Sequence, residues 1–331
     1  MRTIAFFNNK GGVGKTTLVQ HLAWMYAELG LSVVAADLDP QANLSAVLLD
    51  EDRLECLWPD GDHPDSVLGA VSPILRGLGD IRELHVEEIA PNLGLVVGDL
   101  GLSAFEAKLS SAWPDCLSRD ESAFRIESVF HRIVLRAAGR RDADLVLIDV
   151  GPNLGAINRA AIIAADFVVF PLAPDLFSLQ ALRNVGPTLR EWRSAWRDRL
   201  ERRPSTDDLD LPAADIKPAG YVVMQDAVRT GGAVQAYRKW IVRIPEVYRQ
   251  EVLAEIADGS SSAAEDPHCL ATLGHYRSLM AMAREARKPM FHLKAADGAL
   301  GGHSYAVQDC YKDFEMLARG IASKCGVPLG R

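Results

Sequence analysis

A glycine loop with two lysines, close to the first residue of the sequence, carries the most recognisable chemistry of the chain. Residues 9–17 read Asn-Lys-Gly-Gly-Val-Gly-Lys-Thr-Thr. The general phosphate-binding pattern G-x-x-x-x-G-K-[ST] needs a glycine where Asn9 stands, so this loop is a variant, and it carries a second lysine, Lys10. Small residues let backbone N–H groups point at phosphate oxygens. The loop predicts that the chain binds a nucleoside triphosphate.

The segments on either side of the loop are those that a phosphate site needs. The apolar run 3–7 predicts a strand leading into the loop. From Thr16 onward apolar residues recur at spacings of three and four, which predicts a helix, and Gly30 follows as a helix-ending glycine. A helix that begins at the loop directs its positive dipole end at the same anion. In this arrangement Lys15 meets the β- and γ-phosphates, and the hydroxyl of Thr16 coordinates Mg²⁺.

Two later strand-like runs end in carboxylates. The run 32–36 is followed by Asp37 and Asp39, which alternation places on the same side of the chain. The run 145–148 ends at Asp149, the pattern called Walker B. Ligands of open parallel sheets bind at the carboxyl ends of the strands, where such carboxylates suit magnesium and water positioning. Taken alone, the pair at 37 and 39 is equally compatible with a solvated turn.

Together these motifs resemble the ParA/MinD branch of P-loop ATPases, and specifically its ParA-like (Soj-like) members, which act in DNA segregation. The resemblance rests on the loop 10–17, on Asp-Leu-Asp-Pro-Gln at 37–41, and on Ile-Asp-Val-Gly-Pro-Asn-Leu-Gly at 148–155. It implies an α/β fold: a doubly wound, mostly parallel twisted sheet with helices on both faces, as in P-loop NTPases. It also implies ATP and Mg²⁺ as cofactors, slow ATP hydrolysis and an ATP-dependent homodimer.

The resemblance assigns a catalytic set of three residues. Lys10 is implied to reach across the dimer interface to the partner's nucleotide, Lys15 to bind phosphate, and Asp39 to hold the attacking water. The segment 151–155 is implied to be a switch that senses the γ-phosphate.

The same resemblance assigns the metal and nucleotide contacts. Thr16, Asp37 and Asp149 form the implied magnesium site, with Asp149 acting through water. The implied nucleotide contacts, of which the last two lie beside the adenine, are Gly11, Gly12, Val13, Gly14, Lys15, Thr16, Thr17, Met224 and Pro245.

Three positions depart from the family pattern. Gly151 stands where the first of two prolines is usual, which predicts a more flexible switch. Ala42 replaces a common glycine, and Glu246 follows Ile244-Pro245 where a basic residue is usual. Because none of these is a catalytic position, they affect the expected coupling to partners rather than nucleotide binding.

Length and composition favour one large α/β domain. With the resemblance, residues 1–331 are expected to form a single ParA-like domain with loop insertions near 50–66, 204–218 and 257–267. Helices are expected at 103–117, 122–138 and 304–324, the last packed in the core rather than on a membrane. No run approaches the ~18 apolar residues that span a bilayer, and the first residues already read as a strand, so neither membrane nor signal peptide is expected. Five dispersed cysteines fit reduced thiols and a cytoplasmic location.

A basic stretch suggests a partner surface in a chain whose net charge is −8. Residues 183–203 contain seven arginines and three acids, and Arg190, Arg193 and Arg197 share one helical face. A solvated helix face explains this pattern without any partner. With the family resemblance, the stretch predicts weak, non-specific DNA binding that an ATP-bound dimer strengthens, and hence association with the nucleoid.

The sequence is therefore interpreted as an ATP-dependent dimerisation switch for DNA partition or cargo positioning, activated by a ParB-like or other protein. Three alternatives share parts of the pattern: a MinD-type membrane switch, an accessory ATPase of a mobile-element, secretion or phage-defence locus, and a metabolic P-loop enzyme for amidation or cluster delivery.

Overall fold

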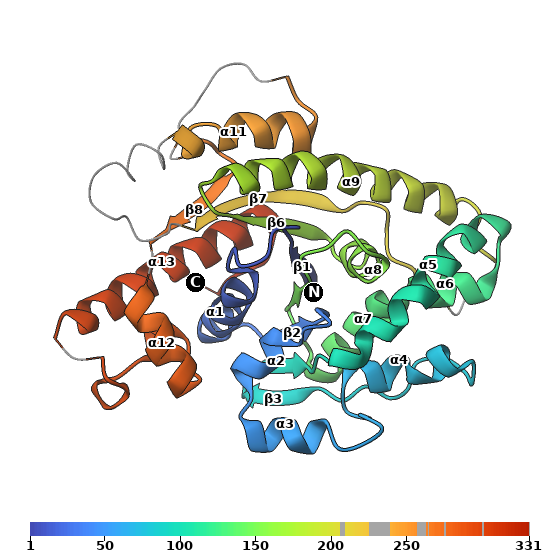
Figure 1. Ribbon diagram of the computed structural model, residues 1–331, viewed down its shortest axis with the longest axis horizontal. Coiled ribbons are helices and arrows are strands. Elements are labelled where there is room, and N and C mark those ends of the chain that lie inside the picture. The colour runs from blue at the N-terminus through green and yellow to red at the C-terminus, as the bar shows by residue number, and fades with distance from the viewer. Residues whose placement is uncertain are drawn as a thin grey trace.

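The architecture is a single twisted sheet with helices on both faces (Figure 1). The computed structural model describes residues 1–205, 209–224, 239–256, 263, 265–274, 276–299 and 301–330. Within these residues eight strands pair in the order β3-β4-β2-β5-β1-β6-β7-β8. Every neighbouring pair is parallel except β3 with β4. The strands are β1 (Arg2–Phe6), β2 (Val33–Asp37), β3 (Glu87–Ala90), β4 (Leu93–Val96), β5 (Leu145–Asp149), β6 (Phe167–Leu172), β7 (Lys217–Met224) and β8 (Cys269–Leu273).

The helices divide between the two faces because strand side chains alternate. On β1, Ile4 and Phe6 point into one core and Ala5 into the other. The first core is covered by α1 (Lys15–Glu28), α2 (Asn43–Leu48), α3 (Glu51–Leu57), α12 (Arg277–Ala286) and α13 (Gly302–Cys325). The second is covered by α4 (Val67–Arg76), α5 (Glu106–Asp115), α6 (Glu121–Glu127), α7 (Val129–Arg141), α8 (Ala156–Ile163), α9 (Leu176–Leu200) and α11 (Ile244–Val247). These observations confirm the predicted fold class.

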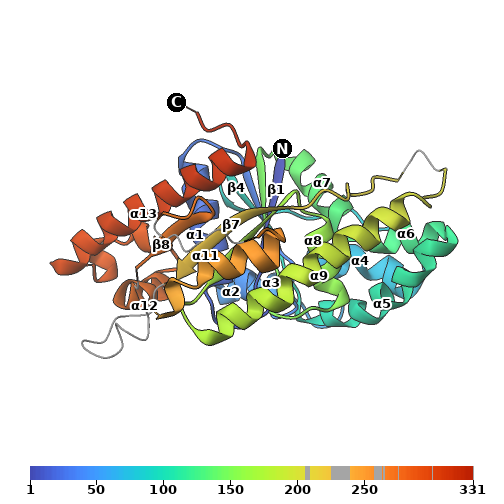
Figure 2. The same cartoon turned by 90° about the horizontal axis from the view of Figure 1, so that it is seen from above.

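The long axis of the molecule separates two helical ends. Figure 2 shows α12 and α13 at one end and α5 and α6 at the other, with the sheet between them. The centre of the sheet aligns the strand ends that the sequence singled out, because Asp149 of β5 pairs with Phe6 of β1 and with Asp37 of β2. The phosphate loop and both aspartates therefore meet at one edge.

Several local predictions need correction. The acidic segment 50–66 is not simply a loop, because it contains α3. Asp50 caps that helix by accepting a 2.7 Å hydrogen bond from the N–H of Arg53, and acids in the first turn favour the helix dipole. The expected helix at 122–138 is divided at Ser128 into α6 and α7, and the one at 103–117 begins as the 3₁₀ helix η1 (Leu100–Phe105).

The C-terminal part of the chain follows the prediction more closely. The helix α13 buries Cys310, Phe314, Leu317 and Ile321 in the core, so its apolar face is not free to act as a membrane anchor. Among the described residues, no helix is both long and apolar enough to cross a bilayer. Of the expected insertions, 204–218 is irregular where described until β7 begins at Lys217, and most of 257–267 lies outside the described residues.

Candidate functional site

The phosphate loop leaves β1 and ends at the first residue of α1. Gly12 and Gly14 have φ of 71° and 86°, the left-handed region that glycine adopts without steric cost. At Gly14 an added Cβ would also lie 2.9 Å from the terminal methyl carbon of Met224. Gly14 is the N-cap of α1 and no side chain caps that helix, so its first N–H groups are available to an anion.

Lys15 lies at the base of this loop and is almost completely buried. Its ammonium group donates to the carbonyl oxygens of Asn8 at 3.2 Å and Lys10 at 3.4 Å. Burial lowers the pKa of Lys15, while the nearby carboxylates of Asp149 and Asp39 oppose that shift. The loop thus holds its lysine against backbone oxygens, with carboxylates close enough to influence its charge.

Thr16 and Asp149 form the next contact of the site. The hydroxyl of Thr16 donates a 2.7 Å hydrogen bond to Oδ2 of Asp149, while Oδ1 of Asp149 is buried without a partner. Burial, reinforced by the charge of Asp37, raises the pKa of Asp149 to about 8. A hydroxyl beside a carboxylate with an unpaired oxygen is the hard-oxygen donor set that suits Mg²⁺. The residues present therefore fit the expected ion.

Asp37 does not line the cavity at the phosphate loop and is completely buried. Its Oδ2 accepts hydrogen bonds of 2.8 Å from both the N–H and the hydroxyl of Ser45 in α2. Burial raises its pKa to about 7, even though the bonds to Ser45 act in the opposite direction. This geometry gives Asp37 a role in anchoring α2, while its Oδ1, like that of Asp149, is buried without a hydrogen-bond partner among the described residues.

Asp39 lies at the mouth of the site, beside the predicted switch. Its Oδ1 accepts a 3.0 Å hydrogen bond from the N–H of Gln41. A Cβ at Gly151 would lie 3.0 Å from the same oxygen, so the switch backbone passes very close to Asp39. Ala42, where the sequence departs from the family glycine, has a left-handed φ of 50°. The loop after β2 therefore keeps the conformation that favours glycine.

The second lysine of the loop does not point into the site. The ammonium group of Lys10 forms an ion pair with Asp175, the N-cap of α9 in the same chain. It also lies 5.9 Å from the ring centroid of Phe177, whose side chain is 69% exposed. Exposed Leu154 and Leu176 belong to the switch and to the start of α9. Lys10 is therefore held at the outer edge of the site.

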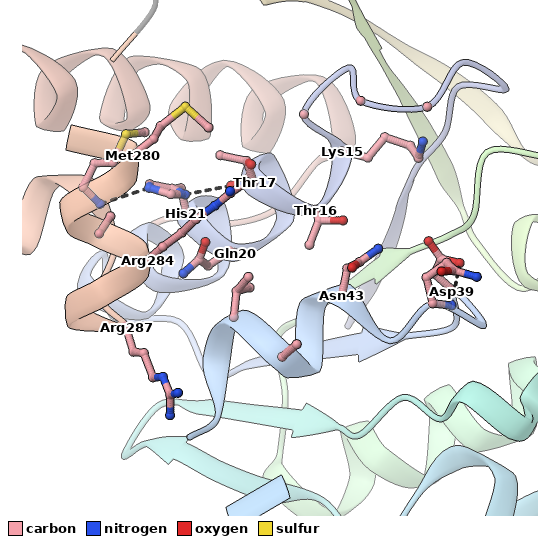
Figure 3. A pocket seen from close by; sticks show the side chains of 18 of the residues that line it. Lys15, Thr16, Thr17, Gln20, His21, Asp39, Asn43, Met280, Arg284 and Arg287 are labelled. Atoms are coloured by element: carbon pink, nitrogen blue, oxygen red, sulfur yellow. Dashed lines mark hydrogen bonds between the residues drawn. The ribbon is translucent and has the colours of Figure 1, made fainter. Parts of the chain in front are cut away.

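A cavity of about 690 Å³ is lined by Lys15, Thr16 and Asp39 but not by Lys10, Asp37 or Asp149 (Figure 3). It runs from the phosphate loop between α1 and α2 to α12, where Arg284 and Arg287 lie at the end opposite Lys15. Its walls include Gly11, Gly12, Gly14, Lys15, Thr16, Thr17, Gln20, His21, Asp39, Gln41, Asn43, Pro152 and Met280. The sequence predicted that the loop glycines, Lys15, Thr16 and Asp39 belong to one site, and in the structure they line the same cavity.

His21 links the α1 wall of the cavity to the C-terminal part of the chain. Its Nδ1 donates to the carbonyl of Thr17 at 2.7 Å, and its Nε2 accepts from the N–H of Met290 at 3.0 Å. The ring stacks on Phe314 with centroids 4.9 Å apart. Burial lowers the pKa of His21 to about 4, so the ring is neutral at neutral pH. No motif in the sequence pointed to this residue.

A smaller cavity of about 150 Å³ adjoins the loop. Of the two residues predicted to contact the adenine, Met224 lines this cavity, and Pro245 is buried at the start of α11 and does not line it. The sequence interpretation missed the residues from the end of β8 onward that complete this cavity. These residues are Leu273, Gly274, Tyr276, Met280, Met290 and Phe314. The rest of the wall comes from Lys10, Gly12, Val13, Gly14, Thr17 and Ala173.

The predicted basic face of α9 is only partly exposed. Arg190 donates to the carbonyls of Glu251 and Val252, and Arg193 is half-buried against the carbonyl of Ile216. Arg197 is the exposed member of the three predicted arginines. Arg202 and Arg203, beyond the end of α9, are also exposed.

Comparison with known proteins identifies the family of the chain. The family model described as AAA domain matches residues 1–202. The chromosome partitioning protein ParA of Caulobacter vibrioides is 29% identical over 201 residues, which cover 61% of this chain and 67% of ParA. Of three other curated relatives, the chain spans only 66%, 47% and 43% of the length.

Solved structures show the same fold. Protein DIP2308 of Corynebacterium diphtheriae matches with a TM-score of 0.71 and 24% identity over 98% of this chain and 99% of its own. A putative plasmid partition protein of Borrelia burgdorferi, bound to AMPPNP, matches with a TM-score of 0.57 and 17% identity over 98% of each chain. The family match covers more than half of the sequence and includes the whole phosphate site. The chain belongs to the AAA domain family and is a P-loop ATPase of the ParA/MinD type.

Proposed function

We propose that the protein is a ParA-like ATPase that dimerises around two ATP molecules and uses slow hydrolysis to time its association with partners. The observation that carries the proposal is the convergence of Lys15, Thr16 and Asp39 on one cavity, with Lys10 held at its outer edge. The AMPPNP bound to the Borrelia partition protein, which has the same fold, supports ATP as the ligand.

In the proposed reaction the residues of the chain stabilise charge and place water. The free N–H groups at the start of α1 and the ammonium of Lys15 bind the phosphates, whose negative charge replaces the backbone oxygens as the partner of Lys15. Asp39 accepts a hydrogen bond from the attacking water and orients it toward the γ-phosphate. Gly151 lies directly beside Asp39, so the switch and the water site are adjacent.

The hydroxyl of Thr16 and the unpartnered oxygen of Asp149 would hold Mg²⁺. When bound, the ion neutralises charge on the β- and γ-phosphate oxygens. Its charge also favours the ionised form of Asp149, whose pKa is otherwise raised by burial. Metal and ATP binding are therefore proposed to be coupled to deprotonation of this carboxyl group.

The smaller cavity beside the loop is proposed to take the adenine. Met224, Leu273 and Tyr276 supply apolar and aromatic surface next to Thr17, the last residue of the loop. Lys10 lies on the border of this cavity and is proposed to leave Asp175 for the nucleotide of a second subunit. The exposed side chains of Leu154 and Phe177 would then be covered by that subunit.

DNA partition or cargo positioning is the proposed use of the switch, with a ParB-like or other protein as activator. The similarity to ParA supports this role. DNA phosphates are proposed to contact mainly Arg197, Arg202 and Arg203, because these three are exposed whereas Arg190 and Arg193 are half-buried. Arg202 donates to the carbonyl of Leu117 at 3.2 Å but stays exposed. Few contacts per subunit make binding weak, and a dimer would double their number on one complex.

The test is retention on non-specific duplex DNA with ATP, with ADP and without nucleotide, together with the ATPase rate. The wild type is expected to hydrolyse ATP slowly and to bind DNA only with ATP. Lys10→Ala should weaken that binding, and Asp39→Ala should prolong it while lowering kcat by about 10²-fold or more. Equal DNA binding in all nucleotide states would contradict the switch.

A further inference from the structure

The switch segment 151–155 is held at its far end by a side chain from another helix. The helix α8 starts directly after this segment, and its N-cap is Gly155, which has no side chain to cap the helix. Glu106, the first residue of α5, supplies the missing acceptor. Its Oε1 accepts a 2.5 Å hydrogen bond from the N–H of Ala156, and its Oε2 accepts one of 2.9 Å from the N–H of Ile157.

The fit around this carboxylate is tight. A Cβ on Gly155 would lie 2.6 Å from Oε1 of Glu106 and 2.9 Å from Oδ1 of Asn153. Only glycine leaves room for the carboxylate to reach the helix start. An anionic side chain at a helix N-terminus is also favoured by the helix dipole. The contact is therefore shaped by both Glu106 and Gly155.

Hydrogen bonds also connect the start of α8 to Gly151, the end of the switch segment that lies beside Asp39. The side-chain N–H groups of Asn158 in α8 donate to the carbonyls of Gly151 and Asn153, both at 2.7 Å. The N–H of Gly155 donates to Oδ1 of Asn153 at 2.8 Å. A movement of the start of α8 would consequently move Gly151, which lies against Asp39.

We propose that Glu106 is a positioning residue for ATP hydrolysis, acting through the start of α8 and the switch to set Gly151 relative to Asp39. The inference rests on the proposed function, because it concerns the hydrolytic step of that site. Glu106 lies outside the set of residues that line the nucleotide cavities described above. Its effect is therefore expected on turnover rather than on nucleotide affinity.

A second set of contacts fixes α5, the helix that carries Glu106, relative to its neighbouring helices. Arg159 of α8 donates to the carbonyl of Leu109 in α5 and to the carboxylate of Glu127 in α6, and its guanidinium stacks 4.1 Å from the ring centroid of Trp113. The guanidinium of Arg199 in α9 also lies over this ring, 3.8 Å from its centroid. The helix that carries Glu106 is thus braced against both α8 and α9.

The test compares Glu106→Ala with Asp120→Ala. Asp120 caps α6 by accepting from the N–H of Ser122, so its removal also deletes a helix cap, but one on a helix other than α8. Glu106→Ala is expected to lower kcat about 10-fold while the KM for ATP changes less than about twofold, because small misplacements of reacting groups are costly. Glu106→Gln keeps one carbonyl acceptor and should recover part of the rate. Asp120→Ala should keep the wild-type kcat.

Hydrogen–deuterium exchange provides a readout that does not depend on activity. It can also be measured on variants of low stability. The amides of 155–158 should exchange faster in Glu106→Ala than in the wild type or in Asp120→Ala, with and without AMPPNP. Equal kcat values for the Glu106→Ala and Asp120→Ala proteins, or unchanged exchange at 155–158, would overturn the positioning role. A wild-type protein without ATPase activity would instead count against the proposed function, and the exchange comparison would still decide whether Glu106 holds the switch.

Discussion

Lys10 forms its ion pair with Asp175, a residue 165 positions later in the same chain. The other carboxylate oxygen of Asp175 accepts a 2.8 Å hydrogen bond from the N–H of Ser178 and so caps α9. The two charged side chains are 26% and 35% exposed, which leaves the pair partly in water. In the proposed dimer Lys10 must leave this partner, so Asp175 competes with the second subunit for the lysine.

The first prediction follows from that competition. Asp175→Asn removes the charge but keeps the cap of α9, because asparagine is an equally good N-cap residue. A partly exposed ion pair contributes up to about 1 kcal/mol, which corresponds to about fivefold in an equilibrium constant. The ATP-dependent dimer should therefore form at several-fold lower protein concentration, as measured by sedimentation equilibrium with AMPPNP.

Asp198→Asn is a suitable control for this variant, since Asp198 is an exposed residue near the other end of α9. It should leave the dimerisation constant unchanged. A weaker dimer in Asp175→Asn would show that Asp175 acts across the interface and not as a competitor.

The parts of the site that are local in sequence could be predicted from it. The loop 9–17, the strand before it, the helix after it and the strand-ending Asp149 all lie close to where the pattern placed them, because a P-loop is built from consecutive residues. The family resemblance carried by these motifs likewise predicted a mostly parallel sheet covered on both faces.

Contacts between distant segments could not be predicted in the same way. Glu106 reaches α8, and His21 reaches Met290, only after the sheet has brought their helices together. The cavity wall proposed for the adenine shows the same limit. The family resemblance assigned Pro245 to the adenine, whereas the cavity beside the loop is lined by Gly274, after β8, and not by Pro245. Segments so distant in sequence meet only in the folded chain.

The second prediction tests that wall directly. Met224→Ala should weaken ATP binding about tenfold, since removing buried apolar surface from the base costs about 1.4 kcal/mol. Inorganic triphosphate, which lacks the base, should bind with unchanged affinity. Pro245→Ala should leave the affinity for ATP as it is. Isothermal titration of both ligands measures this, and an equal loss of affinity for ATP and triphosphate in Met224→Ala would contradict the base site.

The third prediction concerns stability in acid. His21 has a folded pKa of about 4, below the ordinary value of 6.5, so its contribution to stability is complete above pH 6.5 and is lost as the pH falls through about 4. The cost is about 3 kcal/mol over that window. The free energy of unfolding of His21→Gln should therefore fall less between pH 6.5 and 4 than that of the wild type.

Urea unfolding at several pH values measures this difference, and His303→Gln on α13 is the control. The slope of the control should match that of the wild type. If His21→Gln has the same slope as well, the buried imidazole is not the group that titrates.

The fourth prediction separates structural from DNA-binding arginines. Arg199 is buried, stacks on Trp113 and donates to its carbonyl at 2.8 Å, so Arg199→Ala should cost about 2–4 kcal/mol of stability. Arg197→Ala, at an exposed position, should change stability by less than about 0.5 kcal/mol. Thermal or urea unfolding distinguishes the two.

For DNA binding, we expect the exposed arginines near the end of α9 to matter more than the buried Arg199. Replacing Arg197, Arg202 and Arg203 together by alanine should weaken ATP-dependent binding and reduce the log–log salt slope by about 0.9 for each arginine–phosphate pair that the substitutions remove. Titrations of the folded proteins at several salt concentrations measure the slope. An unchanged slope would move the DNA-binding surface away from the end of α9.

The most direct measurement is the mass of Asp39→Ala in solution by sedimentation velocity with ATP, with ADP and without nucleotide. Since this variant should bind ATP and hydrolyse it poorly, it is expected to be a dimer with ATP and a monomer in the other two states. Adding Lys10→Ala should return the ATP-bound protein to a monomer. An Asp39→Ala protein that binds ATP and stays monomeric would contradict the proposed dimer.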